Sequence, residues 1–291
     1  NNPQYLIDKG NKEIFRSEDP CWIQFEFDQP FTCRTIQLAG PARSFQPQRM
    51  TIEASDDGKN FRKIVQLQPP RQGWQNDDFP MTHSIPSTTA KYFRLQYNLE
   101  GTEPGAEDLD AAKWKQNLKV NYIWMSSEAR IHQYEGKNGE AWRVSPRTTT
   151  AQISKDMCID MKKMVDITSY MDSNGKLNWK APKGKWTILR LGHTSTGHTN
   201  ATGGGGIGLE CDKVNPEAIR LQFNSWFGKA YELAGPEIAS RVLKVFHVDS
   251  WECGSQNWSP VFRDEFKKRR GYDIYNYLPV IAGFPLESVE K

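Results

Sequence analysis

The chain has 291 residues, of which 37% are hydrophobic and 25% are charged. This length allows about two domains of ordinary size, and the net charge of +3, from 38 basic and 35 acidic residues, gives no electrostatic case for nucleic-acid binding. No run of about 18 or more apolar residues occurs, so no transmembrane helix is predicted. The first residues, Asn-Asn-Pro-Gln, have none of the features of a signal peptide, and we expect them to lie inside a longer protein.

The N-terminal third predicts an all-β unit. Residues 22–27 alternate apolar and polar side chains, as a half-buried strand does. The Asp57-Gly58 pair within residues 55–61 predicts a hairpin turn, because glycine readily adopts positive φ angles. Short strands separated by turn signals are typical of a sandwich or jelly roll. Further strands are expected at residues 33–38, 50–54, 61–67, 92–97 and 120–125.

A second β-rich segment is predicted over residues 136–200. Strands are expected at 165–168 and 186–191, with a turn at 172–175. Residues 192–206 are rich in glycine and threonine and form a loop by this interpretation. The four consecutive glycines within it could cradle a phosphate, but no P-loop lysine follows them, so we interpret them as a flexible connection.

An α/β alternation follows. Asn215 is a good helix N-cap, the Gly235-Pro236 pair ends the helix, and the apolar residues 242–248 predict a strand. A second helix is expected with Ser259 as its N-cap, Pro260 at its first position and Gly271 just after its end. Helix, strand, loop and helix in this order are typical of an α/β fold. Apolar and aromatic residues of the first helix recur at helical spacing, which predicts that this face packs in a core. They are Ile219, Phe223, Trp226, Phe227, Ala230 and Tyr231.

A polar cluster follows the expected strand at 242–248. It holds the carboxylates Asp249 and Glu252 and the aromatic Trp251. In parallel α/β barrels the reactive groups lie at the C-terminal ends of strands. Cleavage of a glycosidic bond commonly uses one carboxylic acid that gives a proton and one carboxylate that activates water or attacks. The alternative is that Asp249 caps the next turn and Glu252 is a solvated loop residue.

The cysteines and histidines suggest no metal site. The five cysteines are widely scattered without C-x-x-C spacing, which predicts neither a zinc site nor a disulfide framework. Cys253 has no base beside it in sequence, so we interpret it as a small buried residue rather than a nucleophile. His193 and His198 lie in the glycine-rich loop and do not have the spacing of a metal pair on one helix face.

Several of these segments resemble the α-L-rhamnosidase-like glycoside hydrolases of family 106. The resemblance rests on Asp-Ser-Trp-Glu-Cys-Gly, Asn-Trp-Ser-Pro, Phe-Lys-Lys-Arg-Arg-Gly-Tyr-Asp and Gly-Leu-Glu-Cys-Asp-Lys. It extends over roughly residues 120–285. These sequences stand at residues 249–254, 257–260, 266–273 and 208–213, and residues 175–190 are similar to the same family.

The resemblance implies a catalytic role for this region. Glu252 matches the general base of an inverting enzyme, and Asp249, Asn257 and Trp251 are expected to contact the sugar. No residue here matches the general acid, which we expect to lie beyond this chain, so the chain alone is expected to be inactive. The resemblance also suggests calcium at Glu210 and Asp249, because oxygen-rich clusters suit that ion. It implies a periplasmic or extracellular bacterial location.

The N-terminal sandwich resembles discoidin-type modules over roughly residues 18–135. The similar segments are residues 22–27, 55–61 and 90–95. Such modules often bind sugars through loop residues, for which Trp74, Phe79 and Arg43 are the candidates here. The alternative is a module that only supports its neighbour.

The predicted fold is mainly β in its N-terminal two-thirds and ends in an incomplete α/β, TIM-barrel-like portion. We expect a discoidin-like β-sandwich at 1–135, a β-rich segment at 136–200 and a partial (β/α) barrel at 201–291, since a complete barrel takes about 250 residues. The expected partners are an oligosaccharide or polysaccharide substrate and the remainder of the parent enzyme. The alternative function is that of a non-catalytic carbohydrate-binding or scaffolding fragment.

Overall fold

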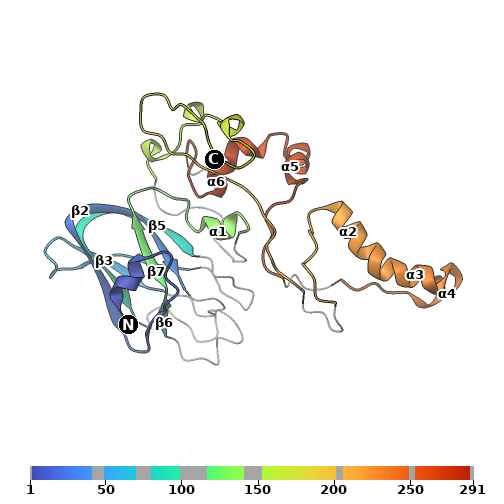
Figure 1. Cartoon of the computed structure of the whole chain (residues 1–291). Coiled ribbons are helices and arrows are strands. Elements are labelled where there is room, and N and C mark those ends of the chain that lie inside the picture. Colours follow the sequence, from blue (N-terminus) through green and yellow to red (C-terminus); the bar gives the residue numbers. More distant parts are fainter. Residues whose placement is uncertain are drawn as a thin grey trace.

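The computed structural model describes residues 2–40, 49–69, 80–98, 117–140, 153–200, 206–248 and 253–288. Figure 1 shows the β-sandwich at one end of the view and the helices labelled α2, α3 and α4 at the other. Loops and short helices lie between these two parts.

The larger sheet is antiparallel and five-stranded, with the order β4-β3-β5-β2-β7. A smaller sheet pairs β1 with β6, and a 3-10 helix, η1 (Pro3–Ile7), precedes both sheets. The expected strands at 22–27 and 33–38 are confirmed, but both belong to β2, which continues through a register shift between Glu26 and Phe31. The strands are β1 (Phe15–Ser17), β2 (Cys21–Ala39), β3 (Thr51–Ser55), β4 (Arg62–Gln66), β5 (Met81–Tyr97), β6 (Leu118–Val120) and β7 (Tyr122–Ser126).

The sandwich core follows from the alternation of side chains along these strands. Ile36 on β2, Ile52 on β3 and Phe93 on β5 are completely buried. Phe93 also makes edge contacts with the stacked rings of Phe27 and Phe31, at centroid distances of 6.0 and 6.4 Å. Full burial of one such side chain contributes about 1.5–3 kcal/mol, so the N-terminal unit has a genuine hydrophobic core.

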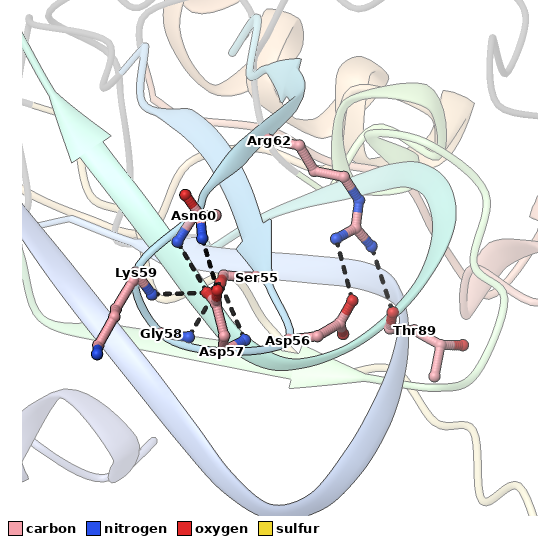
Figure 2. A network of polar contacts seen from close by, with 8 residues as sticks. All are labelled: Ser55, Asp56, Asp57, Gly58, Lys59, Asn60, Arg62 and Thr89. Atoms are coloured by element: carbon pink, nitrogen blue, oxygen red, sulfur yellow. Dashed lines mark hydrogen bonds and ion pairs between the residues drawn. The ribbon is translucent and has the colours of Figure 1, made fainter.

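The predicted hairpin turn is confirmed between β3 and β4 (Figure 2). Asp57 Oδ1 accepts hydrogen bonds from the backbone N–H groups of Lys59 and Asn60, both at 2.8 Å. These bonds, that of Asn60 first, hold the pKa of Asp57 well below its usual range. Gly58 adopts φ +73°, and its N–H donates to Ser55 Oγ at 3.0 Å. The turn is therefore fixed by its own side chains.

Residues 129–140, which include α1 (Tyr134–Lys137), connect the sandwich to the C-terminal part of the chain. The Ile131 N–H donates to the Gly283 carbonyl at 2.8 Å. The Asn138 side-chain amide donates to the carbonyl of Ile281, at the end of α6 (Leu278–Ile281), at 2.7 Å. The guanidinium of Arg130 lies 3.6 Å from the centre of the Phe284 ring. We call this contact the seam, defined by residues 129–140 and 281–284.

A buried polar cluster attaches the seam to β5. The Glu135 carboxylate accepts hydrogen bonds from the hydroxyl and the backbone N–H of Thr82. His132 Nδ1 accepts from the Ser84 N–H at 3.2 Å, and its ring contacts the His83 ring edge-on, with centroids 5.6 Å apart. His83 is only 1% exposed, and neither of its ring nitrogens has a hydrogen-bond partner among the described residues.

The buried histidines predict a loss of stability in acid. Burial lowers the pKa of His83 to about 3 and that of His132 to about 4, both below the unfolded value of about 6.5. The unfolded state therefore binds more protons below pH ~6.5, and stability falls as the pH drops from there toward about 4. We expect a loss of about 3 kcal/mol for each histidine by pH 4, measurable by urea unfolding at several pH values.

Comparison with variants isolates the histidine contribution. The raised pKa of buried Glu135 acts in the opposite direction, because stability from its protonated form is lost as the pH rises. His83→Leu removes one titrating ring without breaking a hydrogen bond, so its acid sensitivity is expected to be smaller. His247→Gln, at an exposed position, is the matched control. An equal pH dependence in His83→Leu and the unmodified chain would contradict this account.

The strands expected at 165–168 and 186–191 are wrong. The described residues from 153 to 200 form three short 3-10 helices and isolated bridges, without a strand. A strand needs a neighbour for its backbone N–H and C=O groups, and the apolar run at 186–191 finds none: Ile188 is 53% exposed. The turn at 172–175 is confirmed, since the Gly175 N–H donates to the Asp172 carbonyl at 2.9 Å. The helices are η3 (Lys155–Met157), η4 (Met161–Lys163) and η5 (Thr168–Tyr170).

The helix ends largely follow the sequence signals. Asn215 caps the helix that begins at Pro216, as predicted. Its side chain accepts a hydrogen bond from the Glu217 N–H at 3.1 Å. The last long helix is followed by Gly271 with φ +81°, also as predicted, but it begins at Phe262 rather than at Pro260, and Val261 stands at its N-cap in place of Ser259. The elements are α2 (Pro216–Phe223), the π-helix η6 (Asn224–Gly228), α3 (Lys229–Ala234), α4 (Pro236–Val242), α5 (Phe262–Arg270) and the 3-10 helix η7 (Ile274–Tyr277).

The strand expected at 242–248 is also wrong. Helix α4 extends to Val242, and the following residues have no strand partner in the described part of the chain. Val245 and Val248 are 79% and 80% exposed, and Trp226, from the stripe expected to pack in a core, is 69% exposed. The described residues thus contain no closed barrel, and they expose large apolar side chains along α2, η6 and α3, such as Leu221 and Leu233 at 69% and 78%. None of the helices in these residues has the length and apolar character needed to cross a membrane.

Candidate active-site region

Only part of the predicted site falls within the described residues. Asp249, Trp251 and Glu252 lie outside them, as do the sandwich loop candidates Trp74, Phe79 and Arg43. Glu210 and Asn257 are described, together with the residues that directly follow Glu252.

Glu210 stands at the end of a short antiparallel pairing between residues 198–200 and residues 208–210. Thr199 and Leu209 form an antiparallel bridge. The Glu210 N–H donates to the His198 carbonyl at 2.9 Å, and the Asn200 N–H donates to the Gly208 carbonyl at 3.1 Å. These bonds hold residues 208–210 beside residues 198–200 and fix the backbone direction at Glu210.

The residues after Glu252 lie against this turn. The Cys253 thiol is a weak donor to the Thr199 carbonyl, with sulfur and oxygen 3.8 Å apart. The His198 ring covers Gly254, because a β-carbon at Gly254 would lie 2.6 Å from His198 Nε2. Residues 198–199 and residues 253–254, more than 50 positions apart in the sequence, are thus in direct contact.

An ion pair stabilises the ionised form of the Glu210 carboxylate. The Lys213 ammonium lies 2.7 Å from the Glu210 carboxylate, and both side chains are 22% exposed. The hydrogen bond from Lys213 is the largest influence that lowers the pKa of Glu210, and a hydrogen bond from the Cys253 thiol acts in the same direction. Burial and the nearby Glu210 charge raise the pKa of Cys211. Glu210 is therefore an anion at neutral pH, whereas Cys211 stays a thiol and lacks the character of a nucleophile.

Gln256 joins residues 212–213 to residues 256–258 through both polar atoms of its side-chain amide. Its amide nitrogen donates to Asp212 Oδ1 and, at 3.3 Å, to the Trp258 carbonyl. Its amide oxygen accepts from the Lys213 N–H at 3.1 Å. The sequence interpretation missed both Gln256 and His198 as contributors to this region, because a neutral amide and a lone loop histidine have no spacing signal of their own.

Asn257 and Trp258 face different surroundings. The Asn257 side chain is exposed, and its β-carbon lies near Gly139 of the sandwich-side seam. The Trp258 ring contacts Phe262 and Tyr275, at centroid distances of 4.9 and 6.3 Å. These aromatic contacts support the loop from the side of α5, and the exposed Asn257 amide remains accessible to a ligand.

A bidentate ion pair anchors α5 beneath this loop. Arg263 Nε and Nη2 lie 3.0 and 2.7 Å from the Asp273 carboxylate oxygens. Hydrogen bonds from Arg263 lower the pKa of Asp273 to about 2. The same guanidinium lies 3.6 Å from the centre of the Tyr275 ring. Arg263 therefore connects α5 to residues 273–275, which follow it in the chain.

Comparison with known proteins identifies the family. Residues 49–291 match glycoside hydrolase family 106, described as alpha-L-rhamnosidase. The chain belongs to this family. The resemblance of residues 249–254 and 208–213 is thereby confirmed, and the segments that meet around Gln256 are both family 106 segments.

Two relatives show how much of a longer protein this sequence represents. A solved rhamnosidase from Novosphingobium sp. PP1Y has the same fold over 92% of this chain, with a TM-score of 0.69 and 24% identity, and the match covers 24% of that protein. A protein of Formosa agariphila, provisionally named a beta-glucuronidase, is 37% identical over 142 residues, which are 48% of this chain and 12% of the relative. The chain therefore spans a quarter or less of the length of either relative.

Carbohydrate-binding modules are also similar to part of the chain. A pectin-binding module matches 44% of it with 20% identity and a TM-score of 0.33.

The contact between His198 and Gly254 predicts a measurable cost for a methyl group. Gly254 and Gly197 have similar φ angles, +69° and +74°, but only at Gly254 would a β-carbon meet another side chain within 4 Å. Gly254→Ala and Gly197→Ala share the backbone strain of a left-handed residue. We expect Gly254→Ala to lower the free energy of unfolding by about 1 kcal/mol more, because the His198 ring must move. Thermal denaturation of both variants measures the difference, and equal costs would show that the ring offers no resistance.

Proposed function

We propose that this chain is part of a family 106 glycoside hydrolase that cleaves α-L-rhamnosides or related glycans with inversion. The observation that supports it most directly is the contact of Asp212 and Lys213 with Gln256, which stands four residues after Glu252. This contact gives the Glu252 loop a fixed attachment on one side. An attached loop suits catalysis, because reacting groups must be held in a defined geometry.

In this proposal Glu252 is the general base. It takes a proton from the water molecule that attacks the anomeric carbon, while a general acid from outside this sequence protonates the leaving oxygen. An inverting pair of carboxyl groups stands roughly 6.5–9.5 Å apart, which leaves room for the water. Asp249 and the exposed Asn257 bind sugar hydroxyls, and Trp251 packs against the sugar ring.

The proposal also assigns the apolar surface of the C-terminal part. Residues 201–291 form part of a (β/α) barrel in the complete enzyme, and the exposed side chains of α2, η6 and α3 pack against its other units. A periplasmic or extracellular location accompanies this proposal, because polymeric substrates are met outside the cytoplasm, and cell fractionation tests it.

Calcium at Glu210 and Asp249 is a subsidiary part of the proposal. Oxygen ligands such as Glu210 suit calcium, but Lys213 already neutralises the Glu210 carboxylate. No group of three or more His, Cys, Asp or Glu within the described ranges could hold a metal ion, so Glu210 alone does not make the site. Asp249 would have to complete it, and Lys213 would compete with the ion.

Calcium binding is tested without any activity measurement. We expect added calcium to raise the melting temperature. The free energy of unfolding should rise by about 2.7 kcal/mol when the calcium concentration is 100 times the dissociation constant. Glu210→Gln is expected to abolish this gain and Lys213→Met to enlarge it, because the competing charge is gone. Glu217→Gln on the exposed face of α2 is the control. A melting temperature that does not respond to millimolar calcium or to a chelator would remove calcium from the proposal.

The role of Glu252 is tested in the full-length hydrolase that contains this sequence. Glu252→Gln keeps the side chain's shape and removes the base, so release of rhamnose from an aryl α-L-rhamnoside is expected to fall by about 10²–10⁴-fold. Glu237→Gln, on exposed α4, should retain full activity. NMR of the first sugar released should show the anomeric configuration opposite to that of the substrate.

Two results would redirect the proposal. Hydrolysis of an aryl β-glucuronide with no action on the rhamnoside would place this chain's substrate nearer to the name of the Formosa agariphila relative. Normal turnover in Glu252→Gln, or binding of glycans without any hydrolysis by the full-length protein, would favour the alternative of a non-catalytic binding or scaffolding fragment.

A further inference from the structure

We infer that Gln256 is a positioning residue that holds the proposed catalytic loop on the segment carrying Glu210. The inference rests on the proposed function and adds a residue to it. Gln256 is adjacent to Asn257, a proposed sugar ligand, and stands four residues after Glu252, the proposed base.

The contacts of Gln256 are matched to its amide. The nitrogen donates to the Asp212 carboxylate and to the Trp258 carbonyl, and the oxygen accepts from the Lys213 N–H. The first and third of these bonds cross between chain segments, whereas the second closes the loop on itself. Of the common side chains of this length, only glutamine supplies two donors and an acceptor at one end.

The partners of Gln256 are held independently of it. Asp212 Oδ1 also accepts from the Val214 N–H at 3.1 Å, and Lys213 forms the ion pair with Glu210 at 2.7 Å. Gln256 therefore binds to a segment that is already ordered. This makes the 210–213 segment the fixed side of the contact and the 253–258 loop the side that is positioned.

Exchanging the charges of residues 212 and 256 tests whether Gln256 positions the loop or only fills space. Gln256→Glu places a carboxylate against Asp212 and removes both donated hydrogen bonds, but keeps the side chain's size. Asp212→Asn combined with Gln256→Glu restores one donor and one acceptor across the same contact, because the asparagine amide can donate to the new carboxylate. Compensation of this kind is expected only if the two side chains act on each other.

The experiment measures kcat, KM and the pH dependence of kcat/KM for an aryl α-L-rhamnoside in the full-length hydrolase. We expect Gln256→Glu to lower kcat by about 10²-fold, the usual effect of misplacing a reacting group by roughly 1 Å, with a smaller change in KM. Its base-limb pKa is expected to shift, because the loop that carries the base has moved. The double variant should recover at least a tenfold part of the lost kcat.

Matched variants keep the result interpretable. Gln29→Glu makes the same chemical change at an exposed position of β2 in the sandwich and should leave kcat unchanged. If Gln256→Glu is too unstable to assay, Gln256→Met keeps the length without the polar atoms or a new charge, and the same loss of kcat is expected. A folded Gln256 variant with wild-type kcat and pH dependence would overturn the inference, and so would a double variant no better than the single one.

Failure of this inference is distinct from failure of the proposed function. If wild-type enzyme hydrolyses the rhamnoside, Glu252→Gln is inactive and the Gln256 variants are normal, then the function stands and the positioning role is wrong. If the wild-type enzyme releases no sugar from the rhamnoside, the proposed function fails first.

Discussion

The ladder between β2 and β5 is the interaction on which the rest of the described structure depends. Its register runs from Cys21 opposite Tyr97 to Leu38 opposite Met81, and its inward side chains make most of the sandwich core. The same ladder fixes the backbone of β5 where Thr82 and Ser84 bind the seam. The seam in turn holds Gly283, and Gly139 lies against Asn257. The candidate site is thus connected to the sandwich through a short series of hydrogen bonds and the close approach of Gly139 to Asn257.

Those contacts are concentrated in a buried polar cluster, which explains why the seam is specific. Glu135 is 1% exposed, yet it is hydrogen-bonded to both the backbone and the side chain of Thr82. A buried carboxyl without partners would cost several kcal/mol, so only one arrangement of α1 on β5 satisfies it. Apolar packing alone would tolerate small shifts of the C-terminal part, whereas this arrangement does not.

The sequence predicts structure well where a segment finds its partner nearby in this chain. The hairpin at Asp57-Gly58, the Asn215 cap and the Gly271 end depend on local chemistry, and all three were found. The strands at 186–191 and 242–248 were predicted from runs of apolar residues. Such a run forms a strand only when a neighbouring strand pairs with it. Residue patterns report how well a segment would suit a sheet, and they carry no information on whether the sheet is present.

The candidate site shows the same limit from another side. Family-like sequence at 208–213 and 249–254 indicated where the chemistry lies, because charged and aromatic residues are visible in a sequence. The contact that joins the two segments is made by Gln256, a neutral residue whose partners stand more than 40 positions away. An amide that bridges a carboxylate and a backbone N–H becomes recognisable only in three dimensions. Residues that hold reactive groups in place are therefore harder to predict from sequence than the reactive groups themselves.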